Sequence, residues 1–304
     1  MTISTPSLVP VPVRAGTGTA PRRADDLSAR RTGLSSAAAA ALVILVAGVA
    51  VAAAVFFSGG GRWFVVSTAS MGEAAPVGTL VLTQPVAGGL SVGEIITFRP
   101  PTAPEQVYTH RIDAMDAGGL LSTRGDANGT ADPWELSESD VIGRAVAVLP
   151  GVGHAIRALP LLAIGLAGLW ALTARFVRPD DRSAARVLGA SFVVSVTVFL
   201  LKPLVGVAIL ATAVENGSAR ATVVSTGLLP IRATVTGGSS VDLTSGMVGT
   251  LSAPVTGATD RYDVTTALHL PPAGWLVMGL VCALPLLWCL IVGLPARTGE
   301  TRNA

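Results

Sequence analysis

Side chains suited to nucleophilic catalysis follow one another in the first half of the chain. Ser70 lies in the stretch WFVVSTASMGEAAPVG, His110 lies in YTHR, and Asp126 and Asp132 lie in TRGDANGTADP. A serine hydroxyl becomes a nucleophile when a base within hydrogen-bonding distance takes its proton and a third group orients that base. The order of these residues therefore suggests a hydrolase site of the Ser-His-Asp type.

The chain contains few other bases. It has three histidines and a single lysine. His154 and His269 stand beside apolar runs and are expected at a membrane interface, while Lys202 lies inside an apolar run, too deep to reach a serine outside the membrane. The residue types alone also allow structural interpretations: Ser70 as a strand serine, His110 on a polar face, and GDANG as a turn, which Gly, Asp and Asn favour.

The composition is that of a membrane protein. Hydrophobic residues make up 50% of the chain and charged residues 13%, whereas a soluble domain carries about 25% charge. A net charge of +2, without a basic patch among aromatic residues, argues against nucleic acid as a partner. The abundance of alanine, and of arginine over lysine, is typical of a high-GC bacterium.

Neither a disulfide nor a metal centre is expected. Cys282 and Cys289 lie in one apolar run. On a helix, this spacing separates them by roughly 10 Å along the axis, beyond the reach of a disulfide. No Cys and His pattern has the spacing of a zinc site. We expect no cofactor.

Four apolar segments predict transmembrane helices, since about 20 residues cross a bilayer. They cover residues 34–57, 158–174, 187–213 and 274–294. The first is longer than the apolar core of a cleaved signal peptide, about 7–15 residues, and is expected to stay as an anchor.

The arginines orient these segments. They gather in a disordered tail at 1–33, in a loop at 175–186 and in a tail at 295–304. The positive-inside rule makes these three parts cytoplasmic. Residues 58–157 and 214–273 then lie outside the cell membrane.

Both outer segments have the pattern of β structure. Short runs rich in β-branched residues, such as TLVLT, EIITF and VYTHRIDAM, are bounded by Gly and Pro in residues 58–157. Residues 214–273 alternate in the same way, as in IRATV and YDVTTALHL. The sequence thus predicts a multi-pass membrane protein of about four helices, with an all-β extracytoplasmic domain and a second small β-rich module. Asn128 and Asn216 begin glycosylation patterns, a weak signal.

Residues 40–155 resemble type I signal peptidases of the archaeal and endoplasmic-reticulum branch. That family has Ser-Met just after a membrane anchor, then Pro-Val-Gly, a strand like VGDVI, a His-Arg pair, and Gly-Asp-x-Asn followed by a further Asp. The matching motifs here are Ser70-Met71, PVG at 76–78, VGEII at 92–96, His110-Arg111, GDAN at 125–128 with Asp132, and VIGRAV at 141–146.

The resemblance implies a membrane-bound serine endopeptidase that removes signal peptides from exported preproteins. Ser70 is then the nucleophile, and His110 is the base at the position where the bacterial branch has lysine. Asp132 matches the acid usually assigned to the triad, and Asp126 is a second, supporting acid. The resemblance also implies small substrate residues before the scissile bond.

The neighbours of the nucleophile follow the same resemblance. The backbone N–H of Ser70, with the hydroxyl of Thr68, is expected to stabilise the oxyanion, and Met71 completes the Ser-Met motif. The chain departs from the family at Glu73, where the family usually has Pro, and at Thr68, where it often has Ser.

The extra spans and the 214–273 module go beyond the minimal family architecture. They leave two alternatives open beside a general signal peptidase. One is a peptidase dedicated to a narrow set of surface proteins, with the second module as its docking site. The other is a non-catalytic membrane scaffold that retains a peptidase-like domain and binds partners through 214–273.

Overall fold

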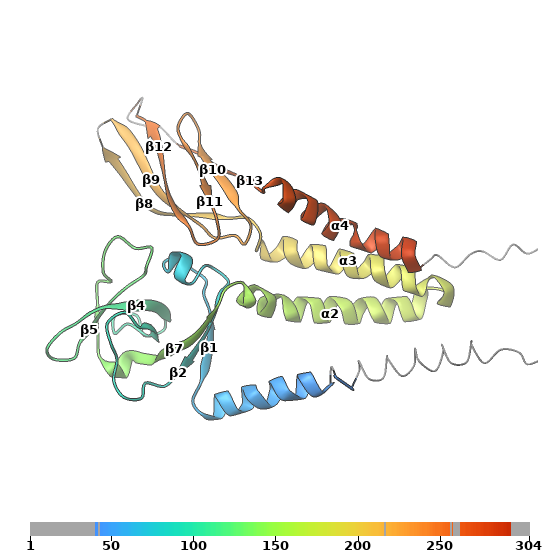
Figure 1. The fold of residues 1–304 in the computed structure, drawn as a ribbon, viewed down its shortest axis with the longest axis horizontal. Helices are drawn as coiled ribbons and strands as arrows, with labels where there is room; N and C mark the ends of the chain where they lie inside the picture. Colours follow the sequence, from blue (N-terminus) through green and yellow to red (C-terminus); the bar gives the residue numbers. More distant parts are fainter. Residues whose placement is uncertain (1–39, 42, 216, 256, 258–261, 293–304) are drawn as a thin grey trace, which may run out of the picture. The chain divides into compact units, whose positions relative to one another are not determined.

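A computed structural model describes residues 40–41, 43–215, 217–255, 257 and 262–292 (Figure 1). The chain divides into two compact units, Met1–Phe57 and Ser58–Ala304. The described residues of the first belong to an apolar helix that includes Val43–Ser58 and so ends at the first residue of the second unit. The predicted tails at 1–33 and 295–304, the start of the predicted first span and Asn216 lie outside the described residues.

The second unit begins with a seven-stranded sheet in which every neighbouring pair is antiparallel. In spatial order its strands are β1 (Arg62–Val65), β2 (Leu80–Gln84), β7 (Val141–Leu149), β3 (Ile95–Phe98), β4 (Tyr108–Met115), β5 (Leu121–Arg124) and β6 (Glu135–Leu136). Short 3-10 helices, η1 (Gly72–Ala74) and η2 (Glu138–Asp140), lie in the connections. The β-rich domain predicted in 58–157 therefore has the expected strand content.

The apolar core of this sheet lies on the same face as the His110 side chain. Ile96, Phe98 and Ile112 are buried, together with Leu121 and Leu136. Because side chains alternate along a strand, His110 shares the buried face of β4 with Ile112 and is itself 3% exposed. The alternation YTHRIDAM thus turns the imidazole into the domain.

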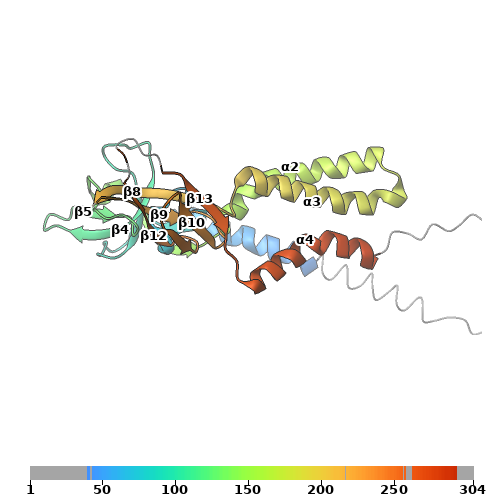
Figure 2. The same cartoon turned by 90° about the horizontal axis from the view of Figure 1, so that it is seen from above.

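Helices α2 (Val152–Phe176) and α3 (Arg182–Leu201) form a hairpin and lie side by side in both views (Figures 1 and 2). The predicted connection at 175–186 is therefore wrong in its bounds: it is shorter and contains the 3-10 turn η3 (Pro179–Asp181). Arg182 explains the tight turn, since its guanidinium donates to the carbonyls of Val177 and Ala174 at the end of α2. Such a cation satisfies the free carbonyls of a helix C-terminus.

The segment predicted as a third span at 187–213 is helical only as far as Leu201. Lys202 adopts a left-handed conformation with φ of 46°, Pro203 follows, and the chain then enters strand β8 (Val207–Glu215). Proline cannot continue a helix, and the β-branched residues after it favour a strand. The prediction that Lys202 lies deep within this helix is wrong, because the residue stands at the helix end.

A second β module follows, made of two three-stranded antiparallel sheets. One contains β12 (Val248–Pro254), β9 (Ser218–Ser225) and β8; the other contains β11 (Ser240–Leu243), β10 (Ile231–Val235) and β13 (Val264–Leu268). Their inner faces meet in a core of Val223, Ile231, Ala233, Val235, Leu243, Leu251 and Ala253. Helix α4 (Pro272–Val292) comes next, close to the segment predicted at 274–294.

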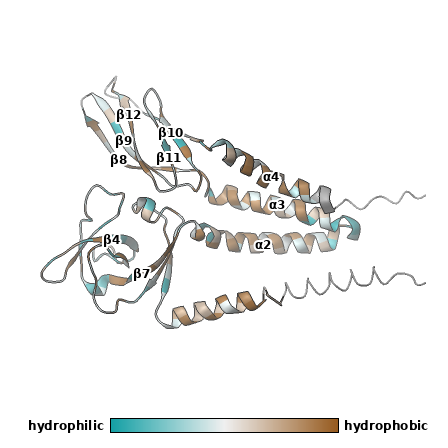
Figure 3. Cartoon of the chain, in the orientation of Figure 1, coloured by the Kyte–Doolittle hydropathy of each residue, from teal (hydrophilic) through white to brown (hydrophobic). Residues whose placement is uncertain are grey.

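Two helices of the described chain, Val152–Phe176 and Pro179–Leu201, have the length and apolar composition needed to cross a membrane. The apolar helices Val43–Ser58 and Pro272–Trp288 are shorter. Hydrophobic residues predominate along all of these helices (Figure 3). The structure is therefore that of a β-rich protein with two helices that could span a bilayer.

Candidate active site

Ser70, His110 and Asp132 form a continuous chain of hydrogen bonds. The His110 Nε2 atom lies 2.9 Å from the Ser70 Oγ atom, and its Nδ1 atom lies 2.6 Å from the Asp132 Oδ2 atom. A carboxylate only accepts, so Nδ1 carries the proton and donates to Asp132. The free electron pair of Nε2 then faces the Ser70 hydroxyl, which is the tautomer that a general base requires.

Burial strengthens these interactions. The side chains of His110 and Asp132 are 4% and 7% exposed, and Phe98 packs edge-on to the imidazole with ring centroids 6.2 Å apart. A low local dielectric makes each hydrogen bond electrostatically stronger than in water. It also makes a carboxylate without partners costly, so Asp132 depends on its donors.

A second donor to Asp132 comes from Thr123. Its hydroxyl donates to the Asp132 Oδ2 atom at 2.6 Å, and the Asp132 backbone N–H donates to the Thr123 carbonyl at 2.8 Å. Thr123 is fully buried in β5, the strand beside β4. No sequence motif identifies Thr123 as a site residue; its position in TRGD, three residues before Asp126, is the one feature of the sequence that places it near the site.

The turn after β5 holds the serine. The Ala127 backbone N–H donates to the Ser70 carbonyl at 2.8 Å. A Cβ on Gly125 would lie 2.5 Å from that carbonyl oxygen and 2.9 Å from the Ser70 Cβ. Glycine is therefore required at residue 125 because the turn approaches the Ser70 backbone so closely.

Asp126, predicted as a supporting acid, bonds to Arg111 instead of His110. The guanidinium donates to both Asp126 oxygens, at 2.9 and 2.6 Å, and to the Gly93 carbonyl at 2.8 Å. This bond to Asp126 raises the pKa of Arg111. The pair ties β4 to the turn that carries Ala127, so Asp126 acts on the position of Ser70 through the backbone.

Two hydrogen-bond donors, the Thr68 hydroxyl and the Ser70 backbone N–H, lie at the serine. The Thr68 Oγ1 atom lies 3.3 Å from the Ser70 Oγ atom. Within the part of the chain that the structure describes, the Ser70 backbone N–H has no hydrogen-bond partner. Met71, the residue after Ser70, is 1% exposed, so its side chain anchors this segment in the domain.

A cleft of about 440 Å³ opens beside the serine. Residues 64–68 line one wall and residues 106–110 line the other. Strand β1, which supplies Phe64 and Val65, is at the end of the seven-stranded sheet. A free strand edge in the wall of a cleft can pair with an extended peptide.

The remaining candidate bases lie outside this hydrogen-bond chain. The His154 ring donates from Nε2 to the Val77 carbonyl at 3.1 Å, and the His269 Nε2 atom lies 3.5 Å from Asp242. Among the described contacts of the Ser70 hydroxyl, His110 and Thr68 are the partners, and Lys202 is absent. The described residues contain no group of three or more His, Cys, Asp or Glu placed to hold a metal ion.

No model of a known protein family matches the chain, and no curated protein is significantly similar to it in sequence.

The close contact at Gly125 gives a prediction about stability. We expect Gly125→Ala to destabilise the domain by about 1–3 kcal/mol, because overpacking displaces Ser70 or the turn. Gly129→Ala is the matched control, since nothing lies within 4 Å of its added Cβ. Thermal unfolding of the purified variants measures both. Equal losses in the two variants, or no loss at Gly125, would contradict the described packing.

Proposed function

We propose that the chain is a membrane-bound serine endopeptidase of the signal peptidase I type, acting on exported preproteins. The observation that carries the proposal is the hydrogen-bond chain from Ser70 through His110 to Asp132 beside an open cleft. The likeness of residues 40–155 to signal peptidase motifs supports the choice of substrate.

In the proposed mechanism, the Ser70 hydroxyl attacks the substrate carbonyl while His110 Nε2 takes its proton. The Nδ1–H of His110 stays bonded to Asp132, whose charge stabilises the imidazolium. His110 then gives the proton to the leaving amine, and an acyl-enzyme forms on Ser70. A water molecule, activated by the same imidazole, hydrolyses the ester and frees the serine.

The tetrahedral oxyanion needs hydrogen-bond donors beside Ser70. Its own backbone N–H, free of partners among the described residues, and the nearby Thr68 hydroxyl are placed for this role. One such donor contributes roughly 2.7–4 kcal/mol to transition-state stabilisation. Thr68 has the hydroxyl group that a serine often supplies at this position in the family that the chain resembles.

The cleft favours an extended polypeptide as the substrate. Its walls come from residues 64–68, which include the end of the edge strand β1, and from residues 106–110 at the start of β4. An extended chain lying there places a peptide carbonyl at Ser70. By resemblance, small residues precede the bond that is cut.

The proposal includes four membrane spans with both chain ends in the cytoplasm. Its support is the distribution of arginines and the presence of two helices able to cross a bilayer, together with the two shorter apolar helices Val43–Ser58 and Pro272–Trp288. The seven-stranded domain and the second module are then outside, where signal peptides emerge.

Replacement of the nucleophile tests the activity. Ser70→Ala is expected to abolish cleavage of signal-bearing preproteins without altering membrane insertion, because loss of a covalent nucleophile costs several orders of magnitude in rate. The measurement is processing of a preprotein panel in membranes that contain either form. Processing by Ser70→Ala at near wild-type rate would exclude this peptidase mechanism.

The identity of the base is tested in the same assay. His110→Ala is expected to be inactive, and Lys202→Met is expected to retain most activity, because among the described residues His110 is the base that contacts the Ser70 hydroxyl. If Lys202→Met is inactive and His110→Ala active, a serine–lysine dyad replaces the proposed mechanism.

Thr123 is expected to position Asp132. Thr123→Val removes the hydroxyl but keeps the shape, and we expect a lower kcat with little change in KM, roughly tenfold for a lost hydrogen bond to a charged group. Thr123→Ser restores the donor and is expected to recover most of the rate. Equal activity of the Val and Ser variants would show that this bond has no role in catalysis.

Membrane topology gives a separate prediction. After Cys282 and Cys289 are replaced, a cysteine at exposed Ser240 is expected to react with an impermeant thiol reagent added outside the cell. A cysteine at exposed Asp180, in η3, is expected to react only after permeabilisation. Labelling of residue 180 from outside, or failure to label residue 240, would contradict the four-span arrangement.

A further inference from the structure

The sandwich of the second module is open along one side. Strand β12 packs over β10 and β11, so that side of the sandwich is closed. Strand β8 is at the other end of its sheet, and β13 is at the corresponding end of the facing sheet. Neither strand has a second neighbour among the described residues.

The register shows which face of β8 is left open. Ile209 lies opposite Val223 and Val214 lies opposite Ala219, and directly opposed residues share a face of the sheet. Val223 is fully buried in the core, so Ile209 and Val214 also point toward the inside of the sandwich. They are nevertheless 54% and 71% exposed, which means that the facing sheet is too narrow to cover them.

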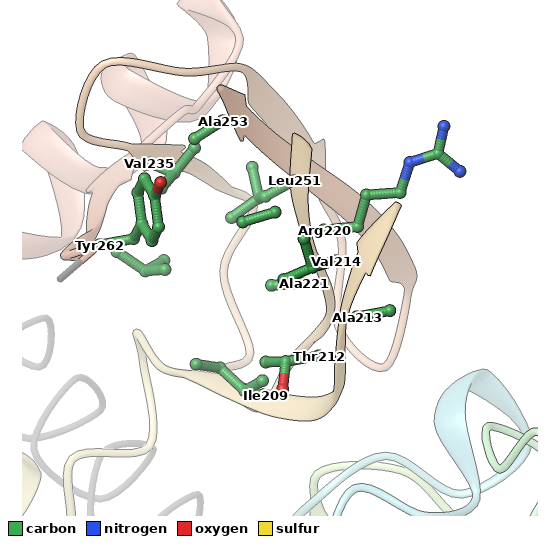
Figure 4. Close-up of a pocket in the computed structure, with 12 residues that line it drawn as sticks. Ile209, Thr212, Ala213, Val214, Arg220, Ala221, Val235, Leu251, Ala253 and Tyr262 are labelled. Atoms are coloured by element: carbon green, nitrogen blue, oxygen red, sulfur yellow. The ribbon is translucent and has the colours of Figure 1, made fainter. Parts of the chain in front are cut away.

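An apolar pocket of about 370 Å³ occupies this opening. Figure 4 shows Val235 and Tyr262 on one side, Ile209 and Thr212 on the other, and Leu251 between them. Arg220 is the one charged side chain among the described residues that line the pocket; it extends away from the pocket and pairs with Glu215 at 3.0 Å. The rest of the described lining is uncharged and mostly apolar, which suits apolar side chains.

The free edge of β13 supplies the second half of the site. The Asp263 carbonyl accepts from the Thr236 backbone N–H, and the His269 backbone N–H donates to the Pro230 carbonyl. The backbone groups of Asp263 and His269, on either side of β13, therefore point toward β10 and its ends. Backbone groups alternate along a strand. The backbone groups of Val264, Thr266 and Leu268, whose side chains face inward, therefore point to the free edge of β13. No described residue pairs with these groups.

We propose that the second module binds an extended segment of another polypeptide as an added strand along β13. Its backbone pairs with the free edge, and alternate apolar side chains enter the pocket against Ile209 and Val214. Peptide groups on a free strand edge pair with the backbone of an extended peptide, and the apolar described lining favours apolar side chains on that peptide. The binding is independent of cleavage at Ser70.

Binding is tested on the full chain in detergent, with Ser70→Ala present so that no cleavage occurs. The probe is a fluorescent peptide, Lys-Thr-Val-Thr-Val-Thr-Val-Thr-Lys, followed by anisotropy. Val214→Lys is expected to weaken binding about tenfold or more, because a charge then faces the apolar side chains of the added strand. Ala211→Lys is the matched control: it is exposed on the same strand, but opposite Thr222 on the outer face.

The backbone contribution is tested with two N-methylated peptides, one methylated at the valines and one at the threonines. Only alternate N–H groups of an added strand face β13, so one peptide is expected to lose binding and the other to keep it. Equal weakening by the two lysine variants, or equal binding of the two methylated peptides, would overturn the proposal.

A dimer of the chain is the alternative occupant of this face. Absence of peptide binding, combined with a dimer that Val214→Lys dissociates, would also overturn the proposal, since the face would then join two copies of the chain.

Discussion

The site depends on one buried carboxylate oxygen. Asp132 Oδ2 accepts from His110 Nδ1 and from the Thr123 hydroxyl, each at 2.6 Å. A buried charge is tolerated when its hydrogen bonds are made and is costly when they are not. The two donors come from adjacent strands, β4 and β5. The pairing of these strands therefore fixes the orientation of the imidazole before any substrate arrives.

The serine reaches this pair through the backbone. Strands β1 and β4 are four places apart in the sheet, about 19 Å if the sheet were flat. The curvature of the sheet and the segment that follows β1 together bring Ser70 to His110. The turn after β5 then fixes it, through the Ala127 N–H and the close approach of Gly125. Arg111 and Asp126 secure that turn from the neighbouring strand.

Local patterns predicted much of this arrangement. Alternation in VYTHRIDAM agrees closely with β4. The motifs selected Ser70, His110, Asp126 and Asp132, and the structure joins Ser70, His110 and Asp132 in one hydrogen-bond chain. The patterns could not separate the roles of Asp126 and Asp132, because the choice depends on which carboxylate lies beside Nδ1 and which beside Arg111. Thr123 was missed because a buried strand threonine has the same pattern whether or not its hydroxyl meets a carboxylate. The apolar run through Lys202 was read as one span because a β-branched strand and a helix are equally hydrophobic there. The open side of the second module depends on strand pairing between distant segments, which no local pattern records.

The most direct test of the account is whether Asp132 acts only through His110. Cleavage rates are measured for Asp132→Asn in the wild-type chain and in a His110→Ala background, with long incubations and mass spectrometry of the products. In the wild-type chain, the account predicts a loss on the order of 10³–10⁴-fold, because the orienting group of the base is gone. In the His110→Ala background, it predicts no further loss, because residues that act as one unit are not additive. An equal loss from Asp132→Asn in both backgrounds would contradict the account.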